Sequence, residues 1–312
     1  MKKTLAAAVL AAITPLLSAP IQAEPRWGPE DQIGAANLVT QASVLAASGL
    51  ITTGKTYALG MIIDDKIPAY PPRKLGLTIV QPNQIDSKGH GPTMSSYNDD
   101  VFSGWLGIGS QIDGLGHVGR SHEYYNGHKG ADFAQPGGLT KLGVENIPPI
   151  VARGVVLDIA GLKGKPVMDA GEVITPQDIQ AAAAAQNVEL REGDVVLLHT
   201  GWLSLLTGEN TDPARYGRGE PGIDPAAAAY LAELGAVAVG ADTWGVEAVP
   251  FAPGAGVFEA HQVLLKDHGV YILENMVTEE LVADGVDEFL FVLGVTRLRG
   301  AVQMMINPVA IR

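Results

Sequence analysis

The sequence contains no cysteine among its 312 residues. A disulfide framework, a thiolate nucleophile and a thiolate metal ligand are therefore excluded. Aromatic residues are also scarce, at 6%, and the 21 basic residues are outnumbered by 34 acidic ones. The resulting net charge of −13 argues against nucleic acid and anionic membrane surfaces as partners.

Long apolar segments are absent beyond the N-terminus, where Lys2 and Lys3 precede an apolar run over residues 5–17. This layout, with small residues up to Ala23, is typical of a secretory signal peptide, and the run is too short to span a bilayer comfortably. We expect cleavage after Ala23 and a mature protein that is periplasmic or secreted. The removed segment has two basic and no acidic residues, so the mature net charge is −15.

The mature chain, residues 24–312, is long enough to form one large domain with its own core. We find no internal repeat and no domain boundary in it. From residue 150 onward, strand and helix patterns alternate, as in an α/β protein. Strands are predicted over residues 55–64, 154–159, 195–199, 236–241, 270–273, 289–298 and 301–306, helices over 40–48, 175–187, 224–235 and 257–267, and long loops over 84–100 and 120–138.

Three candidate metal ligands, Gln111, Asp113 and His117, lie in a glycine-rich stretch. If a strand ends at Asp113, then Gln111 and Asp113 project to the same face, and the glycines that follow permit a turn that brings His117 back beside them. An amide oxygen, a carboxylate and an imidazole suit a divalent cation such as Mn²⁺ or Zn²⁺. Three ligands leave coordination positions open, as a catalytic site requires.

Short motifs follow one another in a set order along nearly the whole mature chain. They are residues 26–31 (Arg-Trp-Gly-Pro-Glu-Asp), 110–117 (Ser-Gln-Ile-Asp-Gly-Leu-Gly-His), 142–148, 152–158, 199–202 (His-Thr-Gly-Trp) and 240–242, followed by His261 and Glu274. Together they resemble the metal-dependent cyclase superfamily, which includes kynurenine formamidases and isatin hydrolases. The resemblance implies a swivelling β/β/α-type fold with mixed sheets and flanking helices, a divalent metal, hydrolysis of an amide, formamide or lactam, and an assembly of identical subunits.

The central motif departs from the formamidase pattern His-x-x-x-His-x-Asp-x-x-x-His. When the two are aligned on Asp113 and His117, the first histidine falls at Gly107 and the second at Gln111. Because glycine has no side chain to ligate a metal, we expect one divalent ion rather than two. Gln111 is the least secure ligand of the three, since its amide could equally bind a water that is held by the metal.

The resemblance also implies roles for His261 and Glu274. A helix that carries His261 and a strand that ends in Glu274 would allow the two side chains to converge, as an acid/base pair or as additional ligands. The alternative for His261 is an ordinary, partly buried histidine. His199 and Asp242 follow predicted strands, where α/β proteins tend to build sites, but an ordinary capping role is at least as probable for Asp242.

All four tryptophans lie in or beside these motifs, which would suit a pocket for an aromatic or cyclic substrate, although packing in the core is the commoner fate of tryptophan. No GxSxG elbow is present, so a serine hydrolase of that type is not expected. The leading hypothesis is an exported metal-dependent hydrolase of a small cyclic amide, formamide or lactam. The alternatives are a metal-dependent lyase, dehydratase or cyclase, and a non-catalytic periplasmic protein that binds a small ligand.

Overall fold

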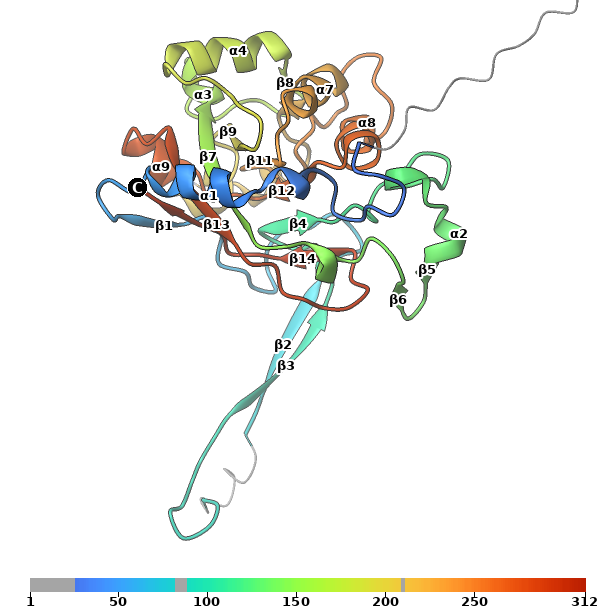
Figure 1. The fold of residues 1–312 in the computed structure, drawn as a ribbon. Helices are drawn as coiled ribbons and strands as arrows, with labels where there is room; N and C mark the ends of the chain where they lie inside the picture. Colours follow the sequence, from blue (N-terminus) through green and yellow to red (C-terminus); the bar gives the residue numbers. More distant parts are fainter. Residues whose placement is uncertain (1–25, 82–88, 209–210) are drawn as a thin grey trace, which may run out of the picture.

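A curled, mixed sheet of nine strands forms the centre of the protein in the computed structural model (Figure 1). The structure describes residues 26–81, 89–208 and 211–312, so the predicted signal peptide lies outside the described residues. In spatial order the strands are β1 (Thr56–Ala58), β15 (Val309–Ile311), β13 (Glu288–Leu293), β7 (Ile150–Asp158), β9 (Val195–His199), β11 (Ala238–Ala241), β12 (Tyr271–Glu274), β4 (Gln111–Asp113) and β14 (Gln303–Met305).

Four parallel strands, β7, β9, β11 and β12, make up the middle of this sheet. Val196 pairs with Val155 on one side and with Val239 on the other, and all three are buried. Such continuous β-branched runs are typical of strands that are covered on both faces. Since parallel strands end at the same edge, the ends of β9, β11 and β12 bring polar side chains together there.

Helices flank the sheet, and three of them begin where the sequence predicts. Thr40 caps α1 (Gln41–Ser48), Thr175 caps α4 (Pro176–Ala185), and Asp224 caps α7 (Pro225–Glu233). Figure 1 shows α4, α7 and α8 (Glu259–His261) together on one side of the sheet. No helix in the described part of the chain is both long and apolar enough to cross a membrane. The remaining helical segments are η1 (Gly34–Leu38), α2 (Gly130–Phe133), η2 (Tyr125–Gly127), η3 (Val144–Asn146), α3 (Ile159–Leu162), α5 (Ser204–Thr207), α6 (Pro213–Tyr216), η4 (Gln262–His268) and α9 (Glu279–Ala283).

The α/β class with mixed sheets and flanking helices is confirmed, but several boundaries differ from the prediction. The strand predicted over residues 55–64 is only β1, because the chain leaves the sheet after Ala58. The helix predicted over residues 257–267 begins at Glu259 and continues as the π-helical segment η4. The strand predicted over residues 289–298 ends at Leu293, and β15 was not predicted.

The largest correction concerns a two-stranded arm formed by β2 (Leu75–Val80) and β3 (Asp99–Gly104). It projects away from the body of the protein (Figure 1). The prediction gave no strand at β2. Of the loop predicted over residues 84–100, residues 84–88 lie outside the described residues, 89–98 belong to no named strand, and only the last two residues are in β3. Short two-residue strands complete the structure: β5 (Ala134–Gln135) pairs with β6 (Gly138–Leu139), and β8 (Val173–Ile174) pairs with β10 (Gly222–Ile223).

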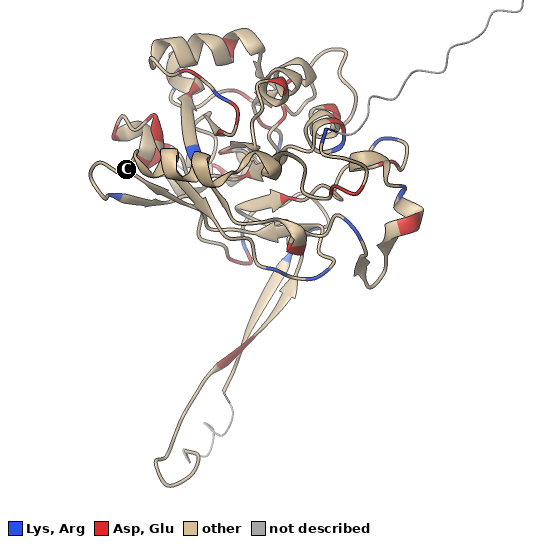
Figure 2. Ribbon diagram, in the orientation of Figure 1, with Lys and Arg blue, Asp and Glu red and all other residues tan. Residues whose placement is uncertain are grey.

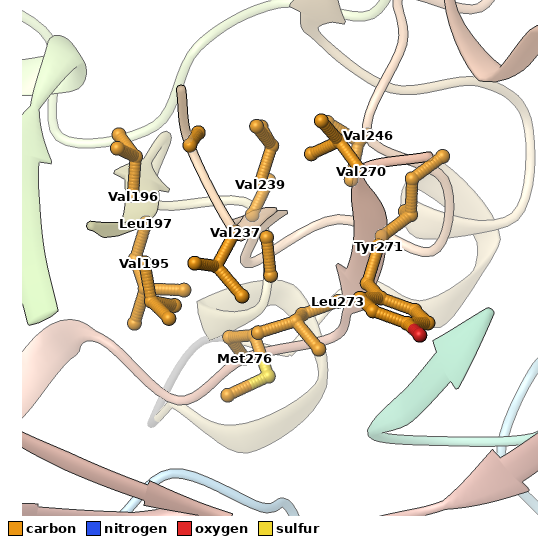
Figure 3. Packing of buried hydrophobic residues seen from close by; sticks show 14 of the residues in the cluster. Val195, Val196, Leu197, Val237, Val239, Val246, Val270, Tyr271, Leu273 and Met276 are labelled. Atoms are coloured by element: carbon orange, nitrogen blue, oxygen red, sulfur yellow. The ribbon is translucent and has the colours of Figure 1, made fainter. Parts of the chain in front are cut away.

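The core lies against the parallel strands, where Val195, Leu197, Val237 and Leu273 pack closely (Figure 3). Leu197→Ala would remove three carbon atoms of a side chain that is fully buried in the central strand β9. We expect the free energy of unfolding to fall by about 2–5 kcal/mol, from lost transfer energy and the cavity left behind. Urea denaturation followed by circular dichroism measures it.

The matched control is Leu45→Ala, because Leu45 is 73% exposed on α1. Its effect should stay within about 0.5 kcal/mol. Equal losses in the two variants would contradict the placement of Leu197 in the core.

Candidate metal centre

Asp113, His261 and Glu274 converge in the interior of the protein. One potential ligand atom from each lies within 4.8 Å of the other two, and all three residues are buried. Among the described residues, they form the only such group of three or more histidine, cysteine or acidic side chains. They come from β4, α8 and β12, which are separated in the sequence and meet at one place in the fold.

The antiparallel pairing of β4 with β12 produces this convergence. Gln111 lies directly across from Glu274, and Asp113 lies two residues farther along β4, so the two β4 side chains share a face. This confirms the predicted strand. The backbone N–H of His117 then donates to the carbonyl of Gly114 at 3.0 Å, which closes the predicted turn.

The donor atoms face one another at distances that leave room between them. Asp113 Oδ2 is 3.8 Å from His117 Nε2 and 3.9 Å from His261 Nε2, and His261 Nε2 is 3.4 Å from Glu274 Oε1. Three of the five predicted site residues thus form the compact group, and His117 lies beside Asp113. Burial lowers the pKa of the His117 imidazole, so its ring is neutral near pH 7.

One oxygen of Asp113 has a donor and the other has none. Gln303 Nε2 donates to Oδ1 at 2.6 Å. Oδ2 is buried and has no hydrogen-bond partner among the described residues. Because leaving a buried carboxylate oxygen unpaired is costly, the position beside Oδ2 fits a cation, and the mixed oxygen and nitrogen donors fit a divalent one.

His261 is oriented by Glu247, a residue that the sequence did not single out. The Nδ1 of His261 donates to Glu247 Oε1 at 2.5 Å, which leaves Nε2 directed at Asp113 and Glu274. Burial disfavours the charged ring, but the bonds to Glu247 and Glu274 outweigh it and raise the pKa of His261 to about 10. Loss of the Nε2 proton to a bound metal would leave a histidine held by a carboxylate on one nitrogen and ligating through the other, a common arrangement in metal sites.

Gln111 contacts Glu274 rather than pointing at the open position. Its amide nitrogen donates to Glu274 Oε2. Burial and the nearby charge of Asp113 raise the pKa of the Glu274 carboxyl. Gln111 therefore orients Glu274 in this structure, and its direct ligation of a metal stays a prediction.

Gly107 occupies the place of the first histidine in the formamidase pattern. A Cβ atom there would lie 2.6 Å from Gln303 Oε1 and 2.8 Å from Arg73 Nη1. Arg73 Nη1 donates to the carbonyl of Gly107 at 2.8 Å. The side chains of Arg73 and Gln303 thus fill the space that a side chain at residue 107 would need.

A cavity of about 200 Å³ opens beside the cluster. Its lining residues are Tyr70, Arg73, His117, Val118, Trp244, Gly245, Phe258, His261 and Glu274. Phe258 packs edge-on to both Tyr70 and His261, with ring centroids 6.1 and 5.3 Å apart. Larger hollows of about 590 and 770 Å³ lie elsewhere and contain none of the clustered residues, so chemistry rather than size identifies the site.

The Cyclase family model matches residues 17–248. The chain belongs to the Cyclase family. No curated protein matches the sequence.

A solved structure that is more than 30% identical supports the assignment to the Cyclase family, and more distant structures share the fold. The crystal structure of a novel cyclase is 32% identical, with a TM-score of 0.82, and the match covers 92% of this chain and 96% of that one. An isatin hydrolase bound to the product analogue thioisatinate is 20% identical, with a TM-score of 0.60 and coverage of 87% and 98%. Isatin hydrolase A from Ralstonia solanacearum is 18% identical, with a TM-score of 0.61 and coverage of 87% and 97%.

Glu220 supports the cavity wall of this Cyclase-family protein. Like Glu247, it was not predicted from the sequence as a site residue. Its Oε2 accepts the backbone N–H groups of Trp244, at 2.7 Å, and Gly245, at 3.1 Å. Its Oε1 is buried and has no partner among the described residues. Burial and the nearby charge of Glu274 hold the pKa of Glu220 well above its usual range.

Other residues considered from the sequence lie outside the cluster. His199 Nδ1 is 2.8 Å from Thr278 Oγ1 and 3.5 Å from Asp242 Oδ2, in a separate cavity of about 190 Å³. Of the four tryptophans, Trp244 lines the cavity beside the cluster, whereas Trp202 packs in a separate buried group.

Glu247→Gln tests the orientation of His261. The variant keeps the size of the side chain but removes the charge that holds the Nδ1 proton. We expect affinity for a divalent ion to fall about 10–100-fold, because a ligating histidine depends on its outer partner. Competition with a metal-binding dye measures it.

Glu233→Gln is the matched control, since Glu233 is exposed at the end of α7. It should bind the ion as the unmodified protein does. Unchanged affinity in Glu247→Gln would show that the charge of Glu247 does not support metal binding through His261.

Proposed function

We propose that this protein is an exported metal-dependent hydrolase that cleaves a C–N bond of a small cyclic amide, formamide or lactam. The observation that carries the proposal is the unpaired, buried Oδ2 of Asp113, which faces His261 and lies beside a cavity with aromatic walls. Export rests on the signal-peptide pattern of residues 1–23. The similarity in fold to isatin hydrolases supports the choice of substrate class.

Asp113 Oδ2, His261 Nε2 and Glu274 Oε1 would hold one divalent ion, Mn²⁺ or Zn²⁺, with His117 Nε2 on the cavity side. In that arrangement His261 and Glu274 act as metal ligands rather than as an acid/base pair. Gly107, which has no side chain to ligate a second ion, supports one ion rather than two. When bound, such an ion lowers the pKa of a coordinated water toward neutrality and polarises a carbonyl group.

The chain's own residues would position the substrate. Arg73 lines the cavity and carries donors that can bind a carbonyl oxygen as negative charge develops on it. Tyr70, Trp244 and Phe258 offer flat apolar walls to a ring, and the centroids of Tyr70 and Trp244 are 5.4 Å apart. A cavity of about 200 Å³ favours a small substrate.

A turnover screen in ¹⁸O-labelled water tests the proposal, with N-formyl arylamines, isatin-like lactams and simple esters as substrates. We expect an amide or lactam to be opened with one labelled oxygen in the product, because hydrolysis takes oxygen from water. Turnover of the same compounds without label would instead identify a lyase or cyclase. No turnover, together with a bound ion that has four protein ligands and no exchangeable water, would indicate a ligand-binding protein.

Asp113→Asn tests the proposed metal centre, since it removes the negative charge of the carboxylate and keeps the shape of the side chain. We expect loss of bound metal and at least about a 100-fold fall in turnover, because a catalytic ion supplies several kcal/mol. Asp132→Asn, at an exposed position in α2, should leave both unchanged. Circular dichroism should show both variants folded, and wild-type turnover by Asp113→Asn would overturn the proposal.

A further inference from the structure

A second cavity adjoins the one beside the metal centre. Its volume is about 240 Å³, and Tyr70 and Trp244 line both cavities. The rings of these two residues have centroids 5.4 Å apart and are inclined at 37°, so they stand between the cavities as an aromatic partition. The cavity of about 200 Å³ that reaches His261 and Glu274 is called the inner cavity below, and the second one the outer cavity.

The outer cavity combines apolar walls with one cationic side chain. Pro68 and Val249 contribute apolar surface, and Arg218 is the only charged residue among the described residues that line it. Arg218 Nε donates to the carbonyl of Ala214 at 2.8 Å, which anchors the guanidinium and leaves Nη1 and Nη2 for a ligand. Two donors in a rigid fork suit a carboxylate or a similar anion.

Arg218 has no acidic partner within residues 26–81, 89–208 and 211–312, although the protein is acidic. Its chain carries 34 acidic and 21 basic residues, and Figure 2 shows the two kinds interspersed over the body of the protein. Arg215, one turn earlier, lies 3.6 Å from Asp169. A ligand anion in the outer cavity would therefore meet a positive charge that no described carboxylate neutralises.

The aromatic partition also carries an unused donor. The Nε1 of Trp244 is buried and has no hydrogen-bond partner in the part of the chain that the structure describes. The backbone N–H of the same residue donates to Glu220 Oε2 at 2.7 Å, which holds the partition in place. A buried donor without an acceptor is costly. An acceptor on a ligand that spans both cavities would satisfy it.

We propose that the outer cavity is a subsite for an anionic substituent of the substrate, and that Arg218 determines this specificity. The substrate is then a small aryl amide, formamide or lactam. Its reacting carbonyl lies in the inner cavity, and its carboxylate or other acidic group extends past Tyr70 and Trp244 to Arg218. The identity of the reaction rests on the proposed function, whereas the subsite can be tested by binding alone.

Isothermal titration calorimetry tests the subsite with ligands that cannot be hydrolysed at a C–N bond. The ligands are the ketone para-acetylphenylacetate and its methyl ester. We expect the carboxylate to bind about 10-fold more tightly than the ester, because it gains charge-assisted hydrogen bonds from Arg218. In Arg218→Gln this difference should disappear.

Arg191→Gln is the matched control, since Arg191 is exposed and lines neither cavity. It should bind the carboxylate more tightly than the ester, as the unmodified protein does. Equal binding of the two ligands by the unmodified protein, no binding of either, or a preference that Arg218→Gln retains would overturn the proposal.

Gly217→Leu tests the place of the subsite by narrowing the outer cavity. Gly217 lines this cavity, and a Cβ there would meet only the carbonyl of Pro213, at an ordinary contact distance of 3.5 Å. We expect the affinity for para-acetylphenylacetate to fall about 10-fold, because the added side chain occupies the space of the substituent. Gly137→Leu, where a Cβ would meet nothing within 4 Å, is the control. Equal affinities of the two variants would contradict the placement.

Turnover separates the subsite from the proposed function. With para-formamidophenylacetate and its methyl ester as substrates, we expect kcat/KM for formate release to be about 10-fold higher for the carboxylate. Release of formate from both at equal kcat/KM would retain the proposed function and overturn the subsite. Tighter binding of the ketone carboxylate through Arg218, without hydrolysis of any amide, would retain the subsite and overturn the proposed function.

Discussion

The stability of the folded protein depends on how the negative charge buried around His261 is compensated. Asp113, Glu247 and Glu274 all surround this ring, and Asp113 Oδ2 has no donor among the described residues. Removing carboxylates from water is costly unless positive charge accompanies them. Without a metal, the proton on His261 supplies part of that charge, which is why its pKa rises to about 10. A divalent ion between the same groups would supply more, so folding and metal binding should be coupled.

The sequence predicts the parts of the fold in which local pattern and burial agree. The buried runs of β9 and β11 and the helices capped by Thr175 and Asp224 appear where their patterns place them. The spacing of Gln111 and Asp113 likewise predicts one shared face, and β4 has it. In each case a few neighbouring residues determine the outcome, because side-chain period and capping are local properties.

The rest of the site could not be predicted because it depends on contacts between distant segments. Nothing near Glu247 or Glu220 in the sequence marks them, and their roles arise only when the chain brings them beside His261 and Gly245. The arm was missed for a different reason. The alternation of Leu75, Leu77 and Ile79 with Gly76 and Thr78 in β2 is short, and β3 has no such alternation, so the sequence offers no paired strand pattern to recognise.

The central claim is that Asp113, His261 and Glu274 form a catalytic metal site. Its most direct test is elemental analysis of the purified protein, followed by removal of the metal with a chelator and addition of Mn²⁺ or Zn²⁺, with turnover measured at each stage. The account predicts about one ion per chain, loss of turnover on removal, and recovery on addition of one of these ions. Full turnover in metal-free protein would contradict it.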